Sequence, residues 1–216
     1  MSNKEIVQKA LAQLRTESPE RKFKQTVDLV FILKDLDLKK PEEQVDFYFK
    51  LPNGTPKSRK ICALVGPELI EDARKIFDKA FVQQEFEKLG KKEIKKMAEE
   101  YDYFVAQANV MPKVAAVFGR ILGPRGKMPN PKAGCVVAPK SNIQPVFDNL
   151  KQTIRVKTRA SLALQVVAGS SDMSDDKLVE NMVAIYDQVI HHLPKETNNL
   201  KTMSVKFTMS KPVKVI

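Results

Sequence analysis

Apolar residues recur at every second position in several stretches of the chain. Every second residue is apolar from Thr26 to Leu33, from Val45 to Leu51 and from Met203 to Met209. A period of two is typical of strands that bury one face, so each stretch is predicted to be a half-buried strand. A compact apolar run from Leu162 to Val167 predicts a fourth strand.

Helical spacing of apolar residues accompanies these strands near both ends of the chain. Residues 4–15 form one such pattern. A second begins after Ser174, a residue type that caps helices, and ends at His192. Both ends of the chain therefore combine helices with half-buried strands, which predicts an α+β fold for them.

The middle of the chain follows a different pattern. Short apolar runs at Ile61–Val65 and Tyr103–Ala106 are typical of buried strands. Helices are expected from Pro67 onward and over residues 91–101, 110–122 and 142–152. Strands separated by helices predict a parallel, Rossmann-like α/β unit.

These two patterns predict a fold that is part α/β and part α+β, in two domains. Turn residues at 52–56 and a basic connector at 57–60 mark a boundary between the patterns. Domain one is expected to be a discontinuous α+β sandwich formed by both termini, residues 1–57 and 156–216. Domain two is expected to be an inserted Rossmann-like, three-layer α/β domain at 58–155.

Composition adds a charge and a compartment to this picture. The formal net charge is +11, from 37 Lys and Arg against 26 Asp and Glu, and such basicity favours an acidic partner. Cys62 and Cys135 lie far apart without metal-ligand spacing, so we expect two small buried side chains in a reducing compartment. No apolar run reaches membrane-spanning length and no signal-peptide core is seen at the N-terminus, so we expect a cytoplasmic protein without a membrane partner.

The most unusual stretch is the Gly- and Pro-rich segment at 119–134, which contains four glycines and three prolines. Both residue types disfavour helix and strand interiors, so the whole segment is predicted to be a loop. No Asp or Glu occurs from Tyr103 to Phe147. An acid-free basic loop suits a polyanion such as nucleic acid. Its four cations are Arg120, Arg125, Lys127 and Lys132.

Basic residues also accompany aromatic or hydroxyl side chains elsewhere. Lys22 and Lys24 flank Phe23 just before a predicted strand, an arrangement in which a ring stacks on a base while cations meet phosphates. The tail at 208–214 is small, polar and basic. A third cluster is Lys151, Arg155, Lys157 and Arg159. The alternatives are a core position for Phe23, a frayed tail and a solvated strand face.

Catalytic and metal-binding motifs find less support in the sequence. The adjacent His191 and His192 are expected to stabilise a helix C-terminus. Ile121 and Met128 occupy positions where a phosphate-binding loop needs Gly and Ser or Thr. The charge run from Lys91 to Glu100 is interpreted as a solvated helix face. We therefore expect no catalytic residue, no metal and no cofactor.

The segment at 119–134, together with Lys22–Val27 and Thr208–Pro212, closely resembles the universal large-subunit ribosomal protein family numbered one, in its archaeal form. The resemblance covers essentially the whole chain. It implies a discontinuous rRNA-binding domain and an inserted Rossmann-like domain joined by a double hinge.

The resemblance also implies partners and site residues. The partners are large-subunit rRNA in the mobile stalk beside the E site, deacylated E-site tRNA, other components of the large subunit and the protein's own mRNA, whose translation it would repress; the free protein would be a monomer. Two departures are Gln25, where the family usually has an acid, and Ser210, where it usually has Gly. By motif position the RNA surface would include Phe23, Gln25, Thr26, Lys157, Ser204, Thr208, Met209 and Ser210, and the neighbouring cations Lys22, Lys24, Arg159 and Lys211 complete the predicted set.

The sequence therefore predicts a non-enzymatic, structural RNA-binding protein of the large ribosomal subunit. Two alternatives stay open at this point. The first is an enzyme whose Rossmann-like domain binds a nucleotide, with the loop at 119–134 as a lid. The second is a purely regulatory repressor that binds mRNA and never enters the ribosome.

Overall fold

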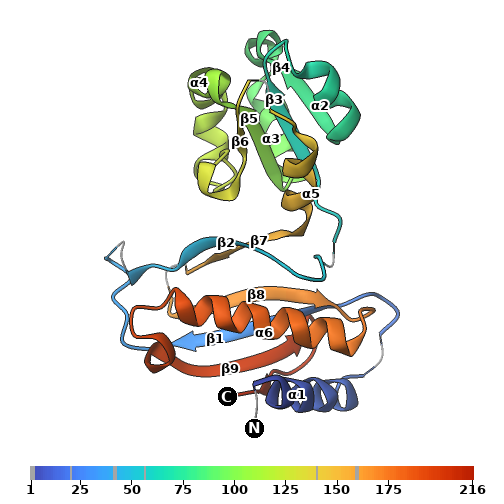
Figure 1. Cartoon of the computed structure of the whole chain (residues 1–216), viewed down its shortest axis with the longest axis vertical. Helices are drawn as coiled ribbons and strands as arrows, with labels where there is room; N and C mark the ends of the chain where they lie inside the picture. Colours follow the sequence, from blue (N-terminus) through green and yellow to red (C-terminus); the bar gives the residue numbers. More distant parts are fainter. Residues whose placement is uncertain (1–2, 20, 41–42, 56, 140, 159–160) are drawn as a thin grey trace. The chain divides into compact units, whose positions relative to one another are not determined.

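The computed structural model describes residues 3–19, 21–40, 43–55, 57–139, 141–158 and 161–216. It divides into two compact units. Unit 1 consists of Met1–Pro56 and Gln152–Ile216, and unit 2 of Lys57–Lys151. Both mix helices with strands, and antiparallel and parallel sheets are both present (Figure 1). The predicted mixed fold class is confirmed.

Unit 1 is built on a four-stranded antiparallel sheet with the order β10-β9-β1-β8. A separate two-stranded ribbon pairs β2 with β7. The elements of unit 1 are α1 (Asn3–Glu17), β1 (Thr26–Leu33), β2 (Asp46–Lys50), β7 (Thr153–Lys157), β8 (Ala163–Ser170), α6 (Asp175–His191), a 3-10 turn η5 (Glu196–Asn199), β9 (Leu200–Phe207) and β10 (Val213–Lys214).

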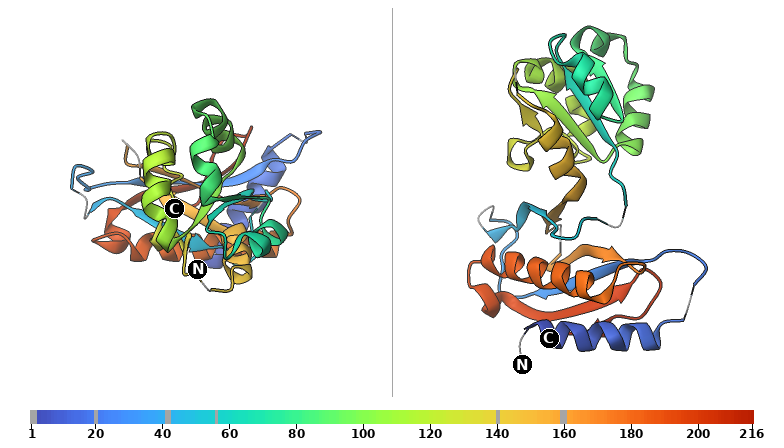
Figure 2. Two further views of the ribbon diagram at one scale, coloured as in Figure 1. Left: turned by 90° about the horizontal axis from the view of Figure 1, so that it is seen from above. Right: turned by 45° about the vertical axis from the view of Figure 1, so that its right-hand side comes forward.

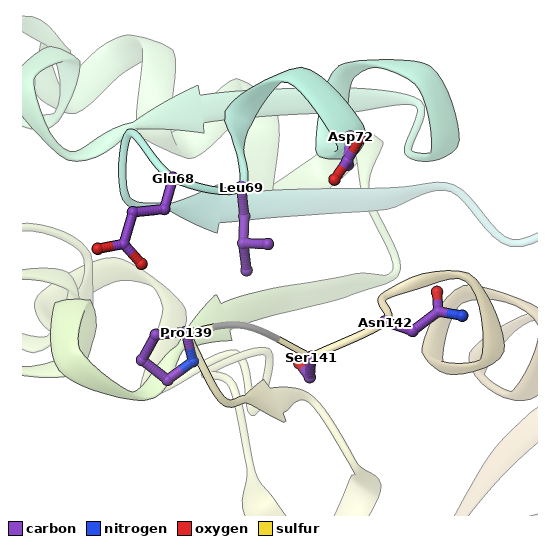
Figure 3. Close-up of a pocket in the computed structure, with 6 residues that line it drawn as sticks. All are labelled: Glu68, Leu69, Asp72, Pro139, Ser141 and Asn142. Carbon is purple, nitrogen blue, oxygen red and sulfur yellow. The ribbon is translucent and has the colours of Figure 1, made fainter.

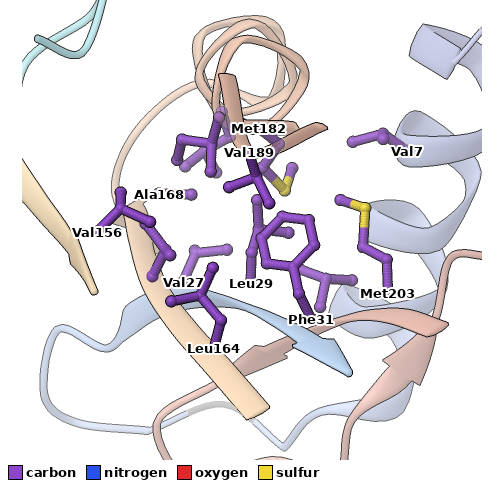
Figure 4. Packing of buried hydrophobic residues seen from close by; sticks show 14 of the residues in the cluster. Val7, Val27, Leu29, Phe31, Val156, Leu164, Ala168, Met182, Val189 and Met203 are labelled. Carbon is purple, nitrogen blue, oxygen red and sulfur yellow. The ribbon is translucent and has the colours of Figure 1, made fainter. Parts of the chain in front are cut away.

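The core of unit 1 lies between one face of this sheet and helices α1 and α6 (Figure 4). The alternating residues Val27, Leu29 and Phe31 of β1 are fully buried there. Val7 of α1 and Met182 of α6 pack into the same cluster. Each large apolar side chain buried in this way contributes about 1.5–3 kcal/mol, so the alternation in β1 fixes which sheet face points inward.

Unit 2 is a three-layer α/β unit around a parallel sheet of order β4-β3-β5-β6. Helices cover both sheet faces (Figure 2). The core on one face includes residues of α3 and α4, and the core on the other includes residues of α2 and α5. The elements of unit 2 are β3 (Ile61–Val65), α2 (Ile70–Ile76), β4 (Lys79–Val82), η2 (Gln83–Lys88), α3 (Lys91–Glu100), β5 (Tyr103–Gln107), η3 (Ala108–Val110), α4 (Met111–Leu122), η4 (Pro131–Ala133), β6 (Val136–Val137) and α5 (Gln144–Gln152).

The two predictions for residues 119–122 differ, and the structure agrees with the helix: α4 continues to Leu122, so the prediction that the whole of 119–134 is a loop is wrong at its start. Gly119 within this helix costs about 1 kcal/mol relative to Ala. The burial of Phe118 and Leu122, both fully buried, outweighs that cost. The loop proper begins at Gly123, and Gly134 closes its 3-10 turn with a φ of 71°, a backbone conformation that favours glycine.

Other boundaries differ from prediction in smaller ways. The helix expected from Pro67 begins at Ile70, and the pattern missed the short, partly buried strand β4. Ser174 is the N-cap residue of α6, yet its side chain makes no capping hydrogen bond. Among the described helices, none is both long enough and apolar enough to cross a bilayer.

Candidate nucleic-acid interface

Two segments of the predicted RNA surface, 22–27 and 208–212, meet through direct hydrogen bonds in unit 1. The hydroxyl oxygen of Thr208, just after β9, accepts from the Thr26 backbone N–H at 3.1 Å and lies 2.9 Å from the Thr26 hydroxyl. The Thr208 N–H in turn donates to the Thr26 carbonyl at 3.2 Å. The fold therefore joins residues that are 182 positions apart into one surface.

Gln25 fixes the adjacent turn although an acid is usual at its position in the resembled family. Its side chain is only 8% exposed, and its Oε1 accepts from the Met209 backbone N–H at 3.1 Å. The Gln25 backbone also bonds to Ser171, both as donor to the hydroxyl and as acceptor from the N–H. An amide oxygen can accept as a carboxylate would, so Gln25 can supply the acceptor for Met209 without a charge.

Ser210 stands in the same turn without backbone strain. Its hydroxyl accepts from the Phe207 N–H at 2.9 Å and donates to the Lys211 carbonyl at 3.0 Å. Among described residues other than glycine, only Asp35 and Glu196 have a positive φ. The conformation therefore does not demand the glycine that the family usually has here.

Two large apolar side chains project from this turn region into solvent. Phe23 is 54% exposed and Met209 is 62% exposed. The alternative that Phe23 is a core residue is therefore wrong. Exposed rings and thioethers beside cations provide stacking and van der Waals contact for unpaired bases or sugars. Of those cations, Lys22 is exposed, and Lys24 forms an ion pair with Asp172 that raises the pKa of Lys24.

The sheet face opposite the helices carries polar groups that sequence reasoning missed. Asp28 of β1 points to this face, with Lys206 of β9 directly opposite. Asp28 is 6% exposed; its Oδ2 accepts from Gln165 Nε2 at 3.2 Å, and its Oδ1 has no partner among the described residues. Burial raises the pKa of Asp28, and the Gln165 bond and Lys206 oppose the rise. A lone carboxylate inside an alternating strand was the signal available in the sequence.

Ser204 belongs to this same face, whereas Lys157 does not join the hydrogen-bonded turn. Ser204 pairs with Val30 of β1 and is half-buried. Lys157 lies on β7 in the separate ribbon, and its Nζ is 3.4 Å from Asp46. Arg159 lies outside the described residues.

In unit 2 the predicted basic loop is held to the end of helix α3. Arg125 pairs with Glu99 at 2.9 Å, and the Lys127 ammonium donates to the Tyr101 carbonyl at 2.7 Å. Burial lowers the pKa of Lys127. Cations near a helix C-terminus are favoured by its carbonyl groups. Arg120, on α4, and Lys132, on η4, are exposed.

The parallel sheet of unit 2 offers poor chemistry for a nucleotide. Ligands of such sheets bind at the carboxyl ends of the strands where the strand order reverses, here between β3 and β5. At that point the Gly66 N–H donates to Gln107 Oε1 at 2.7 Å, so a buried side chain occupies the amide that would face a phosphate. The nearby hollow is lined by carboxylates Glu68 and Asp72, which repel phosphate (Figure 3).

The side chains of His192, Cys62 and Cys135 are packed against other parts of the fold. The His192 ring stacks on Phe47 with centroids 3.8 Å apart, and its Nδ1 lies 2.8 Å from the Gln188 carbonyl. Cys62 and Cys135 are buried free thiols, and burial raises their pKa values to about 12 and about 11. Within the described ranges no group of three His, Cys, Asp or Glu could hold a metal ion.

Comparison with known proteins gives consistent matches along the chain. The model of the family described as "Ribosomal protein L1p/L10e family" matches residues 14–211. "Large ribosomal subunit protein uL1" of Methanothermobacter thermautotrophicus is 38% identical over 213 residues, covering 97% of this chain and 98% of that protein. Proteins of the same name from Nanoarchaeum equitans and Thermococcus kodakarensis are 37% and 35% identical, over 93% and 95% of this chain and 95% and 94% of their own lengths. All three relatives are archaeal.

Proposed function

The chain belongs to the ribosomal protein L1p/L10e family and is a structural constituent of the large ribosomal subunit, and from this premise we propose that the exposed sheet face and adjoining turn of unit 1 bind large-subunit rRNA directly. The chain is of archaeal type, and it is a structural RNA-binding protein of the cytoplasmic ribosome rather than an enzyme.

The observation that carries this proposal is the joining of the two segments at Thr26 and Thr208. Their hydrogen bonds form a fixed surface of hydroxyl and amide groups, beside which Phe23 and Met209 are exposed. A folded RNA presents riboses, phosphates and unstacked bases, which this surface can contact by hydrogen bonding and stacking. Rigid backbone geometry keeps the ordering cost on binding small.

Asp28 supports the same proposal through its unpartnered oxygen. A carboxylate this buried is unfavourable unless its acceptor sites are used, and Oδ1 has no donor among the residues that the structure describes. Oδ1 is covered by protein atoms in the unbound chain, so RNA binding requires the neighbouring side chains to move aside; a ribose 2′-OH, which DNA lacks, can then donate to this oxygen. We assign Asp28 the role of selecting RNA over DNA at this face.

Three further roles concern the mobile stalk, the release of tRNA and the regulation of translation. We propose that the protein forms the mobile stalk near the E site and assists the release of deacylated tRNA. The exposed Arg120 and Lys132 of unit 2 support a contact with the tRNA backbone. We further propose that the protein's own mRNA competes with rRNA for the same face of unit 1, and that its binding there represses translation of that mRNA.

The test of rRNA binding is a filter-binding titration of the full chain with an archaeal large-subunit rRNA transcript at two salt concentrations. Affinity should fall steeply with salt, because each neutralised phosphate releases counterions. Met209→Ala should weaken binding about tenfold, because burying a Met side chain contributes roughly 1.5–3 kcal/mol and a tenfold change corresponds to about 1.4 kcal/mol. The matched control is Ile216→Ala, since Ile216 is also an exposed apolar residue of unit 1, at 40%. Equal effects of the two substitutions would contradict the proposed face.

A further inference from the structure

Helix α3 of unit 2 carries an excess of lysines on its outward side. It packs Ile94, Met97 and Ala98 into the core. Four exposed lysines lie on the outward side, within an arc of roughly 140° at 100° per residue. This lysine arc consists of Lys91, Lys92, Lys95 and Lys96.

The acids of α3 are all engaged within unit 2. Glu93 accepts from the Gly90 N–H at 2.9 Å and so caps its own helix. Glu99 pairs with Arg125 at 2.9 Å, and Glu100 pairs with Lys60 at 3.1 Å. By contrast, no arc lysine has an acidic partner in the part of the chain that the structure describes. Glu93 and Glu100 lie outside the arc; Glu99 lies within it, at about 80° on the same wheel, but Arg125 offsets its charge. The arc therefore keeps a net positive charge.

The neighbouring helix extends the excess of positive charge. Helix α4 packs beside α3 in the same core cluster, and it contains no Asp or Glu. Its Lys113 and Arg120 are exposed. The helices on the other sheet face differ, because Glu68 and Asp72 line the hollow there. Unit 2 is therefore electrostatically polarised, with its positive side on the α3 and α4 layer.

We propose that the lysine arc is a second RNA-binding surface, which holds the phosphate backbone of a double-helical RNA without selecting its sequence. The inference rests on the proposed function for the identity of the polyanion. Lysines one helical turn apart are spaced by about 6 Å, so the arc can contact successive phosphates of a strand. Such contacts position a protein on a duplex but carry no sequence information.

The chemistry of the arc favours RNA over an acidic protein. Protein interfaces are enriched in aromatic residues, Met and Arg and are depleted of Lys. The exposed positions of α3 from Lys91 to Glu100 are all Lys or Glu, without an apolar anchor. Binding by several lysines alone is the pattern of phosphate recognition, in which released counterions provide the driving force.

The test compares two full-chain variants that lose the same charge. The arc variant is K91Q/K92Q/K95Q/K96Q. The control is K4Q/K39Q/K75Q/K177Q, four exposed lysines that belong to neither α3 nor α4. Gln and Lys have similar helix propensities, so both variants should fold, and thermal unfolding checks this. The probe is a 20-base-pair RNA duplex of arbitrary sequence, titrated at several salt concentrations.

For the arc variant we expect about tenfold weaker duplex binding or more, and a log–log salt slope smaller by about 3 to 4. The control variant should lose less than about threefold. Equal losses in both variants, or unchanged duplex binding by the arc variant, would overturn the proposal; the latter would point to an acidic protein. Met209→Ala should leave duplex binding unchanged, so a failure of rRNA binding at unit 1 is distinguishable from a failure of the arc.

Discussion

Replacing Asp28 by Asn tests the role of this buried carboxylate, because it should make the protein more stable and a weaker RNA binder. The substitution removes the charge and keeps the size of the side chain. An amide oxygen can still accept the Gln165 hydrogen bond that Oδ2 accepts at 3.2 Å. What disappears is the charged Oδ1, which has no partner within the described residues of the protein.

The stability change follows from burial. A buried, unsatisfied polar group costs about 1–3 kcal/mol, and a neutral amide costs less than a carboxylate. We expect Asp28→Asn to gain about 1 kcal/mol at pH 7, or about 2–4 °C in Tm for a chain of this size.

The gain should depend on pH with a defined sign. Burial raises the pKa of Asp28 above its ordinary value of 3.8. The wild-type protein therefore loses stability as the pH rises through this raised pKa, whereas below pH 3.8 the carboxyl is protonated in both folded and unfolded chains. The difference between the two proteins should vanish at that acidic end. Thermal unfolding from pH 3 to pH 7 measures it.

The effect on RNA binding separates two explanations by its sign. If Oδ1 accepts from a 2′-OH, exchanging a charge-assisted hydrogen bond for a neutral one should weaken rRNA binding about 5- to 10-fold. If the face attracts RNA only through net charge, removing a negative charge should strengthen binding. Unchanged or tighter binding in a filter assay, or a lower Tm at pH 7, would refute the reasoning.

Three further predictions concern other parts of the structure. Gly66→Ala should cost about 1–3 kcal/mol in urea unfolding, because its Cβ would meet Gln107 Oε1 at 2.9 Å and disturb a buried hydrogen bond; unchanged stability would mean that Gln107 shifts freely. The hydrogen bond to Arg155 is the main cause of the lowered pKa of Asp46. Asp46 should therefore stabilise the fold above pH 3.8 and lose this contribution as the pH falls through its lowered pKa. The Tm values of Asp46→Asn and wild type should converge in acid, and a gap in Tm that stays constant with pH would contradict this. Cys62, with its pKa raised to about 12, should react with a thiol reagent at pH 8 only after unfolding, and rapid labelling of the native protein would show that the thiol is accessible.

Local periodicity was sufficient to predict the elements that face a core. The strand Thr26–Leu33 was predicted at its observed bounds, because its alternation reflects burial on one face. The helix expected at 91–101 agrees with α3 to within one residue. Strand β4 was missed because it is four residues long and only partly buried, so its pattern is weak.

Contacts between distant segments could not be predicted from periodicity. Thr26 and Thr208 are 182 positions apart, and nothing in either segment names the other as its partner. Arg125 and Glu99 are 26 positions apart, so a loop cation that appeared free in the sequence is paired in the structure. The charge run of α3, interpreted as a solvated helix face, is exposed as expected, but the partners of Glu99 and Glu100 lie in other segments and could not be predicted from the run itself.

The central claim is that unit 1 binds large-subunit rRNA through its exposed sheet face and the turn beside it. Ultraviolet crosslinking of the full chain to an archaeal large-subunit rRNA transcript, followed by mass spectrometry of the crosslinked peptides, tests this claim most directly. We predict crosslinks in the segments 21–28 and 202–211, with Phe23 and Met209 among the crosslinked residues. Crosslinks confined to the outer surfaces of α1 and α6, with both segments unmodified, would contradict the account.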